Sequence, residues 1–296
     1  MMKLRSLLSI VATSFAMFGL AHAEEGFFDS KGAKIHYVTE ATGDAVVLIH
    51  GWLSDSSMWG RDGAGNTKLR EAPGFQLIAM DCRGHGMSDG PREPSKYGAE
   101  MAEDVVRLLE HLKIKKAHLI GYSMGAFIAG KVAASHPERV ISIVYGGQSP
   151  LIVGTPPSPG PNECEIFAKA VDEGKGLGPY LMAVWPADKP KITLDQANAI
   201  TKMMYGAKDV KAMALAGLSL DALEVKAGDL AKCKAPCLFI YGSKEPDRLK
   251  QRVESLRKAL GQGEIVEVKD ADHGTTLVRP EFAAALGAFL VAHKTK

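Results

Sequence analysis

Short runs of apolar residues recur along most of the chain, and each is long enough for one buried strand. The first, AVVLIH, ends at His50, and a later one, KAHLIGYS, ends at Ser123. Polar residues and glycines follow each run, as expected where a strand gives way to a loop. The expected strands, in chain order, are 45–50, 75–81, 116–123, 140–147, 235–242 and 264–270.

Segments with helical spacing separate these strands. In GAEMAEDVVRLLEHL (98–112), Val105, Leu108, Leu109 and Leu112 fall on one face of a helix. Three further helices are expected over 124–138, 247–260 and 279–294. Strands that alternate with helices are typical of a parallel sheet covered on both faces. The sequence therefore predicts an α/β fold with a mostly parallel, doubly wound sheet.

The alternation is interrupted once, between Ser149 and about Leu220. This stretch opens with a proline-rich segment, which cannot form a central strand. Helical segments rich in methionine and aromatic residues follow. The sequence predicts a helical cap over 150–219, inserted between the core segments 24–149 and 220–296. Its apolar side chains either line a pocket for an acyl or alcohol group or pack the cap on the core.

The first 23 residues have the layout of a secretory signal peptide. Lys3 and Arg5 precede an apolar run over 7–20, and Ala21-His22-Ala23 forms a small-residue cleavage site. The alternative is a membrane anchor, but the run is shorter than the about 20 residues that a spanning helix needs. We expect cleavage near Ala23, export to the periplasm or the extracellular space, and no stable membrane insertion of the mature chain.

The charge balance gives no indication of a nucleic-acid partner. The chain of 296 residues has a formal net charge of +2, and removal of Lys3 and Arg5 with the signal peptide leaves 2 − 2 = 0. A neutral chain with scattered charges lacks the basic patch of a nucleic-acid-binding protein. The four cysteines fit no zinc or redox spacing. They are expected to be structural, either free or bridged once.

The segment Gly-Tyr-Ser-Met-Gly (121–125) matches G-x-S-x-G and lies between an expected strand and an expected helix. In that context the pattern predicts a sharp turn that exposes the hydroxyl of Ser123 as a nucleophile. A serine can also simply cap a helix. Capping does not explain glycine at both 121 and 125, where we expect a Cβ to clash with neighbouring backbone.

A serine nucleophile requires a base and a carboxylate that orients the base. Only His273 and His293 follow Ser123 by more than the length of its own helix. His293 is close to the C-terminus and is expected to be solvated, whereas His273 follows the last strand and is the predicted base. Glu245 and Asp247 both follow the strand over 235–242. Glu245 is favoured by position, and Asp247 is the alternative.

Acyl transfer also requires hydrogen-bond donors for the developing oxyanion. The backbone N–H of Met124, directly after the nucleophile, is one predicted donor. The loop HGWLSD after the first strand is expected to supply the second, from Trp52. His50 and His85 are expected to have structural hydrogen bonds rather than a role as base.

Together these features resemble the serine-nucleophile members of the α/β-hydrolase fold superfamily, which include esterases and lipases. HGW, DCRGHGMSD, GYSMG, GSKE and ADHG occur here in that order, over roughly residues 45–150 and 220–296. In this family the acid after the strand is usually Asp in a G-x-x-D pattern, and that position is Glu245 here. The family's dehalogenases and epoxide hydrolases have Asp in place of Ser123.

The resemblance implies a serine hydrolase that cleaves carboxylic esters through an acyl-enzyme. With the predicted signal peptide and the apolar cap, the expected protein is an exported hydrolase of small, apolar esters. No metal and no organic cofactor is implied, because the three side chains supply nucleophile, base and orienting charge. Hydrolysis of a lactone, a thioester, an amide or a carbon–carbon bond is an alternative. A protein that binds a ligand on the same scaffold without catalysis is another. HGWLS differs from the HGGP of proline-releasing peptidases, which makes a peptidase less favoured.

Overall fold

A computed structural model describes residues 23–60, 74–155, 162–186 and 189–295. The predicted signal peptide, apart from Ala23, lies outside these residues, as do residues 156–161 of the proline-rich segment.

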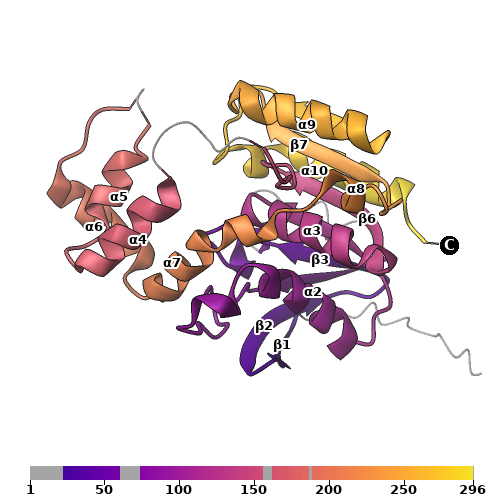
Figure 1. Cartoon of the computed structure of the whole chain (residues 1–296), viewed down its shortest axis with the longest axis horizontal. Helices are drawn as coiled ribbons and strands as arrows, with labels where there is room; N and C mark the ends of the chain where they lie inside the picture. The colour runs from indigo at the N-terminus through magenta and orange to yellow at the C-terminus, as the bar shows by residue number, and fades with distance from the viewer. Residues whose placement is uncertain (1–22, 61–73, 156–161, 187–188, 296) are drawn as a thin grey trace, which may run out of the picture.

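Over the described residues, the core is one sheet of eight strands in the order β1-β2-β4-β3-β5-β6-β7-β8 (Figure 1). The strands are β1 (Glu24–Ser30), β2 (Ala33–Glu40), β3 (Asp44–Ile49), β4 (Phe75–Met80), β5 (Ala117–Tyr122), β6 (Val140–Gly146), β7 (Cys237–Gly242) and β8 (Glu264–Val268). From β4 to β8 every neighbouring pair is parallel, whereas β1 and β2 are antiparallel to their neighbours. The predicted mostly parallel sheet is confirmed, and each of the six predicted strands is present.

The N-terminal hairpin of β1 and β2 was not among the predicted strands. Its two-residue turn has positive φ at both positions, 53° at Lys31 and 83° at Gly32, which is the backbone of a type I′ hairpin turn. The hairpin extends the sheet at one edge through the pairing of β2 with β4.

Helices cover both faces of the sheet. They are α2 (Ala99–His111), α3 (Met124–Ser135), α8 (Ala227–Leu230), α9 (Asp247–Leu260) and α10 (Pro280–Ala292). Alternate residues of each strand face opposite sides, as the two-residue period of a strand requires. In β3, for example, Val47 packs in the cluster with α2, α3, α8 and α9, whereas Val46 packs in the cluster with α10. The sheet is therefore doubly wound.

A group of four helices lies between β6 and β7, beyond one end of the core and on the left of Figure 1. They are α4 (Glu163–Glu173), α5 (Gly178–Ala183), α6 (Leu194–Tyr205) and α7 (Val210–Leu218). We call this group the helical insertion. It has its own buried cluster, which includes Phe167, Tyr180 and Met213. A parallel bridge between Ile152 and Val225 joins the segment that enters the helical insertion to the segment that leaves it.

The methionines of the insertion do not all contribute to its interior. Met203 is 82% exposed and Met204 46% exposed, because α6 turns them toward solvent. These two side chains therefore lie outside the buried cluster of the insertion.

The remaining elements are single helical turns: η1 (Ser56–Trp59), η2 (Pro94–Lys96), η3 (Pro137–Arg139), η4 (Leu220–Leu223) and η5 (Thr276–Val278). All four cysteines are free and buried. Among the helices of the described ranges, none combines the length and the apolar character needed to cross a bilayer.

Candidate active site

The segments that the sequence analysis identified as candidates meet at the end of the sheet formed by the carboxyl ends of its parallel strands. Ser123 follows β5, Glu245 follows β7, His273 follows β8, and the loop from His50 follows β3. These strands are parallel, so their carboxyl ends lie at the same edge, which is where ligands bind in open α/β sheets.

Ser123 occupies a strained turn between β5 and α3. Its φ of 55° and ψ of −115° lie outside the regions that non-glycine residues favour. Its hydroxyl makes no capping hydrogen bond to α3. A Cβ on Gly121 would lie 2.0 Å from the oxygen of Gly125, and one on Gly125 would lie 2.0 Å from the oxygen of Ile49. The expected clash at both glycines is confirmed, and the turn presents the serine side chain away from its own helix.

His273 joins Ser123 to Glu245 through two hydrogen bonds. Its Nε2 is 3.0 Å from the Ser123 Oγ, and its Nδ1 is 2.8 Å from Oε1 of Glu245. A carboxylate only accepts, so Nδ1 carries the proton and the Nε2 lone pair faces the serine hydroxyl. The Glu245 side chain is 4% exposed and that of His273 is 44% exposed. Solvent and substrate can thus reach the imidazole, while the carboxylate behind it is shielded.

The carboxylate also changes the acidity of the histidine. Burial alone would lower the pKa of His273, but its hydrogen bond to Glu245 and the negative charge of that carboxylate outweigh burial and raise the pKa above 6.5.

The other candidates for acid and base lie elsewhere. Asp247 is exposed at the first position of α9, and its side chain makes no hydrogen bond to His273. His293 is half-buried and packs edge-on against Phe289 with 4.6 Å between ring centroids, so the expectation that it is solvated was wrong. Its place at the end of α10 lets the ring fold back on the apolar face of that helix.

Sequence reasoning did not identify a role for Tyr122, the second residue of the motif. Its hydroxyl donates a 2.5 Å hydrogen bond to the backbone oxygen of His273, and its ring lies 5.5 Å from the imidazole. Tyr122 therefore fixes the loop that carries His273. The only sequence signal is an aromatic residue next to the nucleophile, which does not indicate the partner of its hydroxyl.

Two buried, neutral histidines hold the loop after β3. His50 donates from Nδ1 to the Gly51 oxygen at 2.7 Å and accepts from the Cys82 N–H at 2.9 Å. His85 accepts from the Leu53 N–H at 3.3 Å. Burial lowers the pKa of His50, and burial together with the neighbouring His50 lowers that of His85 to about 3. Both rings therefore stay neutral and position the loop, as expected for structural histidines.

The backbone of this loop passes close to the nucleophile. A Cβ on Gly51 would lie 3.4 Å from the Cβ of Ser123. The Trp52 amide, the predicted donor, lies between the Gly51 oxygen held by His50 and the Leu53 amide held by His85. The Met124 amide belongs to the first turn of α3, where N–H groups lack an acceptor within the helix. Both amides thus belong to backbone in a fixed position beside Ser123.

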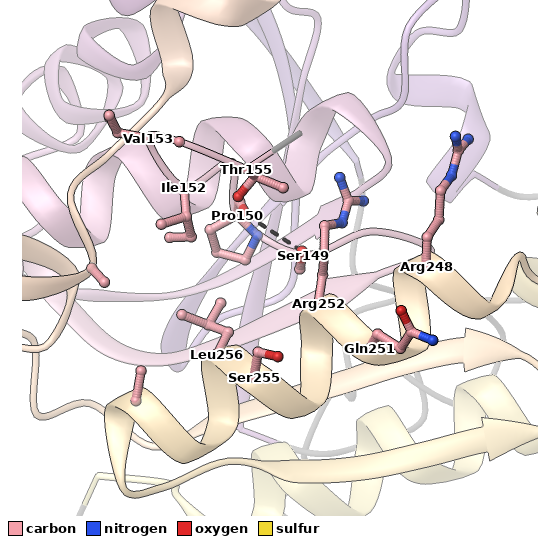
Figure 2. Close-up of a pocket in the computed structure, with 13 residues that line it drawn as sticks. Ser149, Pro150, Ile152, Val153, Thr155, Arg248, Gln251, Arg252, Ser255 and Leu256 are labelled. Atoms are coloured by element: carbon pink, nitrogen blue, oxygen red, sulfur yellow. Dashed lines mark hydrogen bonds between the residues drawn. The ribbon is translucent and has the colours of Figure 1, made fainter. Parts of the chain in front are cut away.

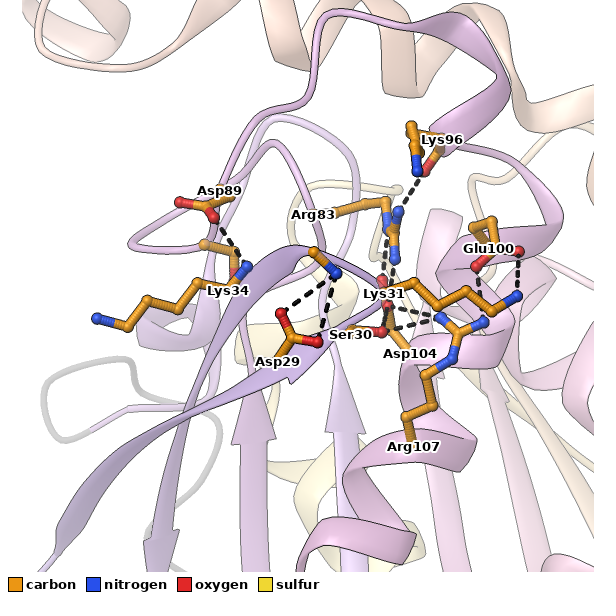
Figure 3. A network of polar contacts seen from close by, with 12 residues as sticks. Asp29, Ser30, Lys31, Lys34, Arg83, Asp89, Lys96, Glu100, Asp104 and Arg107 are labelled. Atoms are coloured by element: carbon orange, nitrogen blue, oxygen red, sulfur yellow. Dashed lines mark hydrogen bonds and ion pairs between the residues drawn. The ribbon is translucent and has the colours of Figure 1, made fainter.

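A buried ionic network supports the segment that carries His85 (Figure 3). Arg83 is buried and binds Asp104 of α2 through two hydrogen bonds of 2.6 and 2.5 Å. Asp104 also accepts from Ser30 at the end of β1, and Ser30 in turn accepts from Arg107 at 2.9 Å. A buried bidentate ion pair of this kind fixes the relative position of its two segments more than it stabilises the folded protein. The network ties the loop after β4 to α2 and to the N-terminal hairpin.

The Trp52 side chain extends from this loop into the helical insertion. Its indole N–H donates to the Met213 oxygen of α7 at 2.8 Å, and its ring packs edge-on against Phe167 and Tyr180. Gly217 of α7 leaves room for it, since a Cβ there would lie 2.8 Å from the indole. A tryptophan directly after His-Gly was the only sequence signal for this contact. One residue thus contributes its amide to the site and its side chain to the insertion.

The described residues contain no group of three or more His, Cys, Asp or Glu side chains arranged to hold a metal ion.

Comparison with known proteins identifies the fold. The family model of the alpha/beta hydrolase fold matches residues 44–180. A solved structure described as one of the carboxylesterases of the Thaumarchaeon Nitrososphaera gargenis superposes with a TM-score of 0.70, at 21% identity, over 90% of this chain and 98% of that one. The chain therefore has the α/β-hydrolase fold.

Two curated relatives are similar over part of their length. An epoxide hydrolase of Caballeronia sordidicola is 28% identical over 60% of this chain, and a pimeloyl-[acyl-carrier protein] methyl ester esterase of Pectobacterium carotovorum is 29% identical over 48% of it. The matches span 51% and 52% of these relatives, so the chain covers about half of each.

Proposed function

We propose that this protein is a serine hydrolase that cleaves carboxylic esters of small molecules through an acyl-enzyme. The observation that carries the proposal is the hydrogen-bonded chain from Glu245 through His273 to Ser123, with spacings of 2.8 and 3.0 Å. These spacings match the reach expected for an orienting acid, a general base and a nucleophile.

In the acylation half, the Ser123 oxygen attacks the ester carbonyl carbon while Nε2 of His273 takes the hydroxyl proton. The carbonyl oxygen becomes an oxyanion, which the amides of Trp52 and Met124 stabilise. Removal of one such donor typically costs about 10²–10³ in kcat. The intermediate collapses, His273 returns the proton to the departing alcohol oxygen, and the acyl group remains on Ser123.

In the deacylation half, a water molecule takes the place of the alcohol. Nε2 of His273 accepts its proton as the water oxygen attacks the acyl carbon. Collapse of the second oxyanion breaks the bond to Ser123, which regains its proton from His273, and the carboxylic acid leaves. Glu245 holds the Nδ1 proton in both halves and stabilises the imidazolium that forms twice in each cycle.

Among the relatives, the methyl ester esterase supports an ester substrate. Epoxide opening is less favoured, because in this family it depends on an Asp nucleophile where this chain has Ser123. A lactone is a cyclic ester and would be cleaved by the same steps. A binding protein without catalysis is the alternative of another class. The strained turn at Ser123 and the buried carboxylate behind His273 cost stability that ligand binding alone would not require.

Steady-state hydrolysis of acetyl, butyryl and octanoyl esters of p-nitrophenol distinguishes these functions. We expect turnover of at least one ester, and near-complete loss in Ser123→Ala with the fold retained by circular dichroism. Lys115→Ala, a change at an exposed position between α2 and β5 that lies outside the proposed machinery, is the control and should leave turnover unchanged. Equal turnover by the native protein and Ser123→Ala would reject the proposal.

A further inference from the structure

A cavity lies apart from Ser123 and His273, between the segment that leads into the helical insertion and helix α9 (Figure 2). Its volume is about 600 Å³. That volume lies within the range of small-molecule sites, roughly 300–1,000 Å³. Neither the hydrogen-bonded chain at Ser123 nor the loop of Trp52 contributes to its lining.

Two arginines of α9 line this cavity one helical turn apart. Figure 2 shows Arg248 and Arg252 extending from the helix in the same direction. Over the described residues, neither guanidinium has a carboxylate within ion-pair distance. Among the residues that the structure describes, Arg252 donates only to the Gln148 amide oxygen, at 2.5 Å, and its buried Nε has no hydrogen-bond partner. By contrast, Arg257 on the same helix is paired with Glu254 at 3.0 Å.

This arrangement of charge is unfavourable without an anion. Burial, together with the charge of Arg248, lowers the pKa of Arg252. Arg248 lies in the first turn of α9, where the helix dipole disfavours a cation. A buried donor without an acceptor adds a further cost. An oxyanion between the two guanidinium groups would satisfy the free Nε and relieve the repulsion.

The walls of the cavity indicate what the anion is attached to. Pro150, Ile152 and Leu256 supply apolar surface, while Ser149 and Ser255 are polar residues of the same lining. An anionic head group with an apolar body matches this division.

We propose that this cavity is a second small-molecule site, in which Arg248 and Arg252 bind the carboxylate or phosphate group of an organic anion while its apolar body lies against Ile152 and Leu256. The site needs no turnover at Ser123, so it can be tested whether or not the protein is an esterase.

Calorimetric titration of the purified protein with octanoate, octyl phosphate and octanol tests the chemistry. We expect both anions to bind, and octanol to bind at least about tenfold more weakly, because a charge-assisted hydrogen bond contributes more than a neutral one. The tighter of the two anions identifies the head group. Equal affinity for octanol and both anions would overturn the proposal.

Charge-removing variants locate the site. Arg252→Gln and Arg248→Gln should each weaken octanoate binding about tenfold or more. Arg257→Gln, which removes a paired charge from the same helix, should not weaken it. Arg248 is exposed, so its replacement leaves the fold intact even if Arg252→Gln fails to fold. Native affinity in Arg248→Gln, or an equal loss in Arg257→Gln, would contradict the assignment.

Discussion

Ser123 and His273 are held from different sides by residues that do not themselves touch a substrate. The Ser123 backbone is fixed by close approach of Gly121 and Gly125 to neighbouring chain. His273 is held at its ring by Glu245 and at its backbone by Tyr122. Each reacting atom therefore depends on a second group for its position, and that dependence makes single substitutions informative.

The identity of the acid gives the sharpest prediction at this scale. Glu245→Gln should lower kcat/KM by up to about 10⁴, because the amide no longer stabilises the imidazolium or fixes its tautomer. Asp247→Asn is the matched control, since it removes a neighbouring carboxylate that is exposed, and it should change kcat/KM little. A severe loss in Asp247→Asn with a mild one in Glu245→Gln would reverse the assignment.

The pH profile tests the same pair independently. His273 must be neutral to accept the serine proton, so kcat/KM falls as pH drops through its pKa, which Glu245 raises above 6.5. Replacement of the Glu245 carboxylate by an amide removes this increase in the pKa of His273. The acid limb of the residual activity of Glu245→Gln should therefore shift to lower pH. An unshifted limb would show that Glu245 does not act on His273.

Among the elements, the loop after β3 and helix α7 are joined by Trp52. Trp52→Phe keeps the backbone amide and an aromatic ring but removes the hydrogen bond to Met213, a loss of about 1 kcal/mol. If the insertion helps to hold the loop after β3, which carries the Trp52 amide, kcat for p-nitrophenyl acetate should fall several-fold in Trp52→Phe with little change in KM. Trp185→Phe removes a comparable indole bond, to Pro190, at the outer part of the insertion, and should leave kcat unchanged. An equal change in kcat in the two variants would show that the hydrogen bond between Trp52 and Met213 does not help to hold the loop after β3.

The sequence predicted the elements whose pattern is local and strong. The strands from β3 to β7 are buried, near-continuous apolar runs, and α2 and α9 have clear helical periodicity. The hairpin of β1 and β2 was missed because its strands mix buried with exposed and polar positions instead of forming an apolar run, and its turn is a two-residue Lys-Gly. The order of strands in the sheet, and the direction of Met203, depend on packing that no local pattern records.

The same distinction applies to the candidate site. The G-x-S-x-G motif predicts Ser123, and their places after expected strands predict His273 and Glu245. The structure brings the three side chains together. The bonds of Tyr122 to the His273 backbone and of Trp52 to Met213 join residues more than 150 positions apart. Sequence alone gives no reason to pair them.

Considered as a whole, the molecule is a doubly wound core with a helical insertion over the edge where the loops meet (Figure 1). We propose that it acts outside the cytoplasm, on the basis of the charged, apolar and A-x-A segments over 1–23. Mass spectrometry of the protein purified from an exporting host should find Glu24 at the N-terminus. Intact Met1 in the exported fraction would contradict this proposal.

The central claim is that Ser123 carries the acyl group during turnover. Protein mixed with excess p-nitrophenyl acetate and quenched in acid within one turnover can be digested and its peptides analysed by mass spectrometry. Glu245→Gln, in which deacylation is slowed, provides a second sample where the intermediate should accumulate. We predict one acetyl group, on the peptide that contains Ser123, and none in Ser123→Ala. Turnover without acetylation of that peptide, or the same labelling in Ser123→Ala, would contradict the claim.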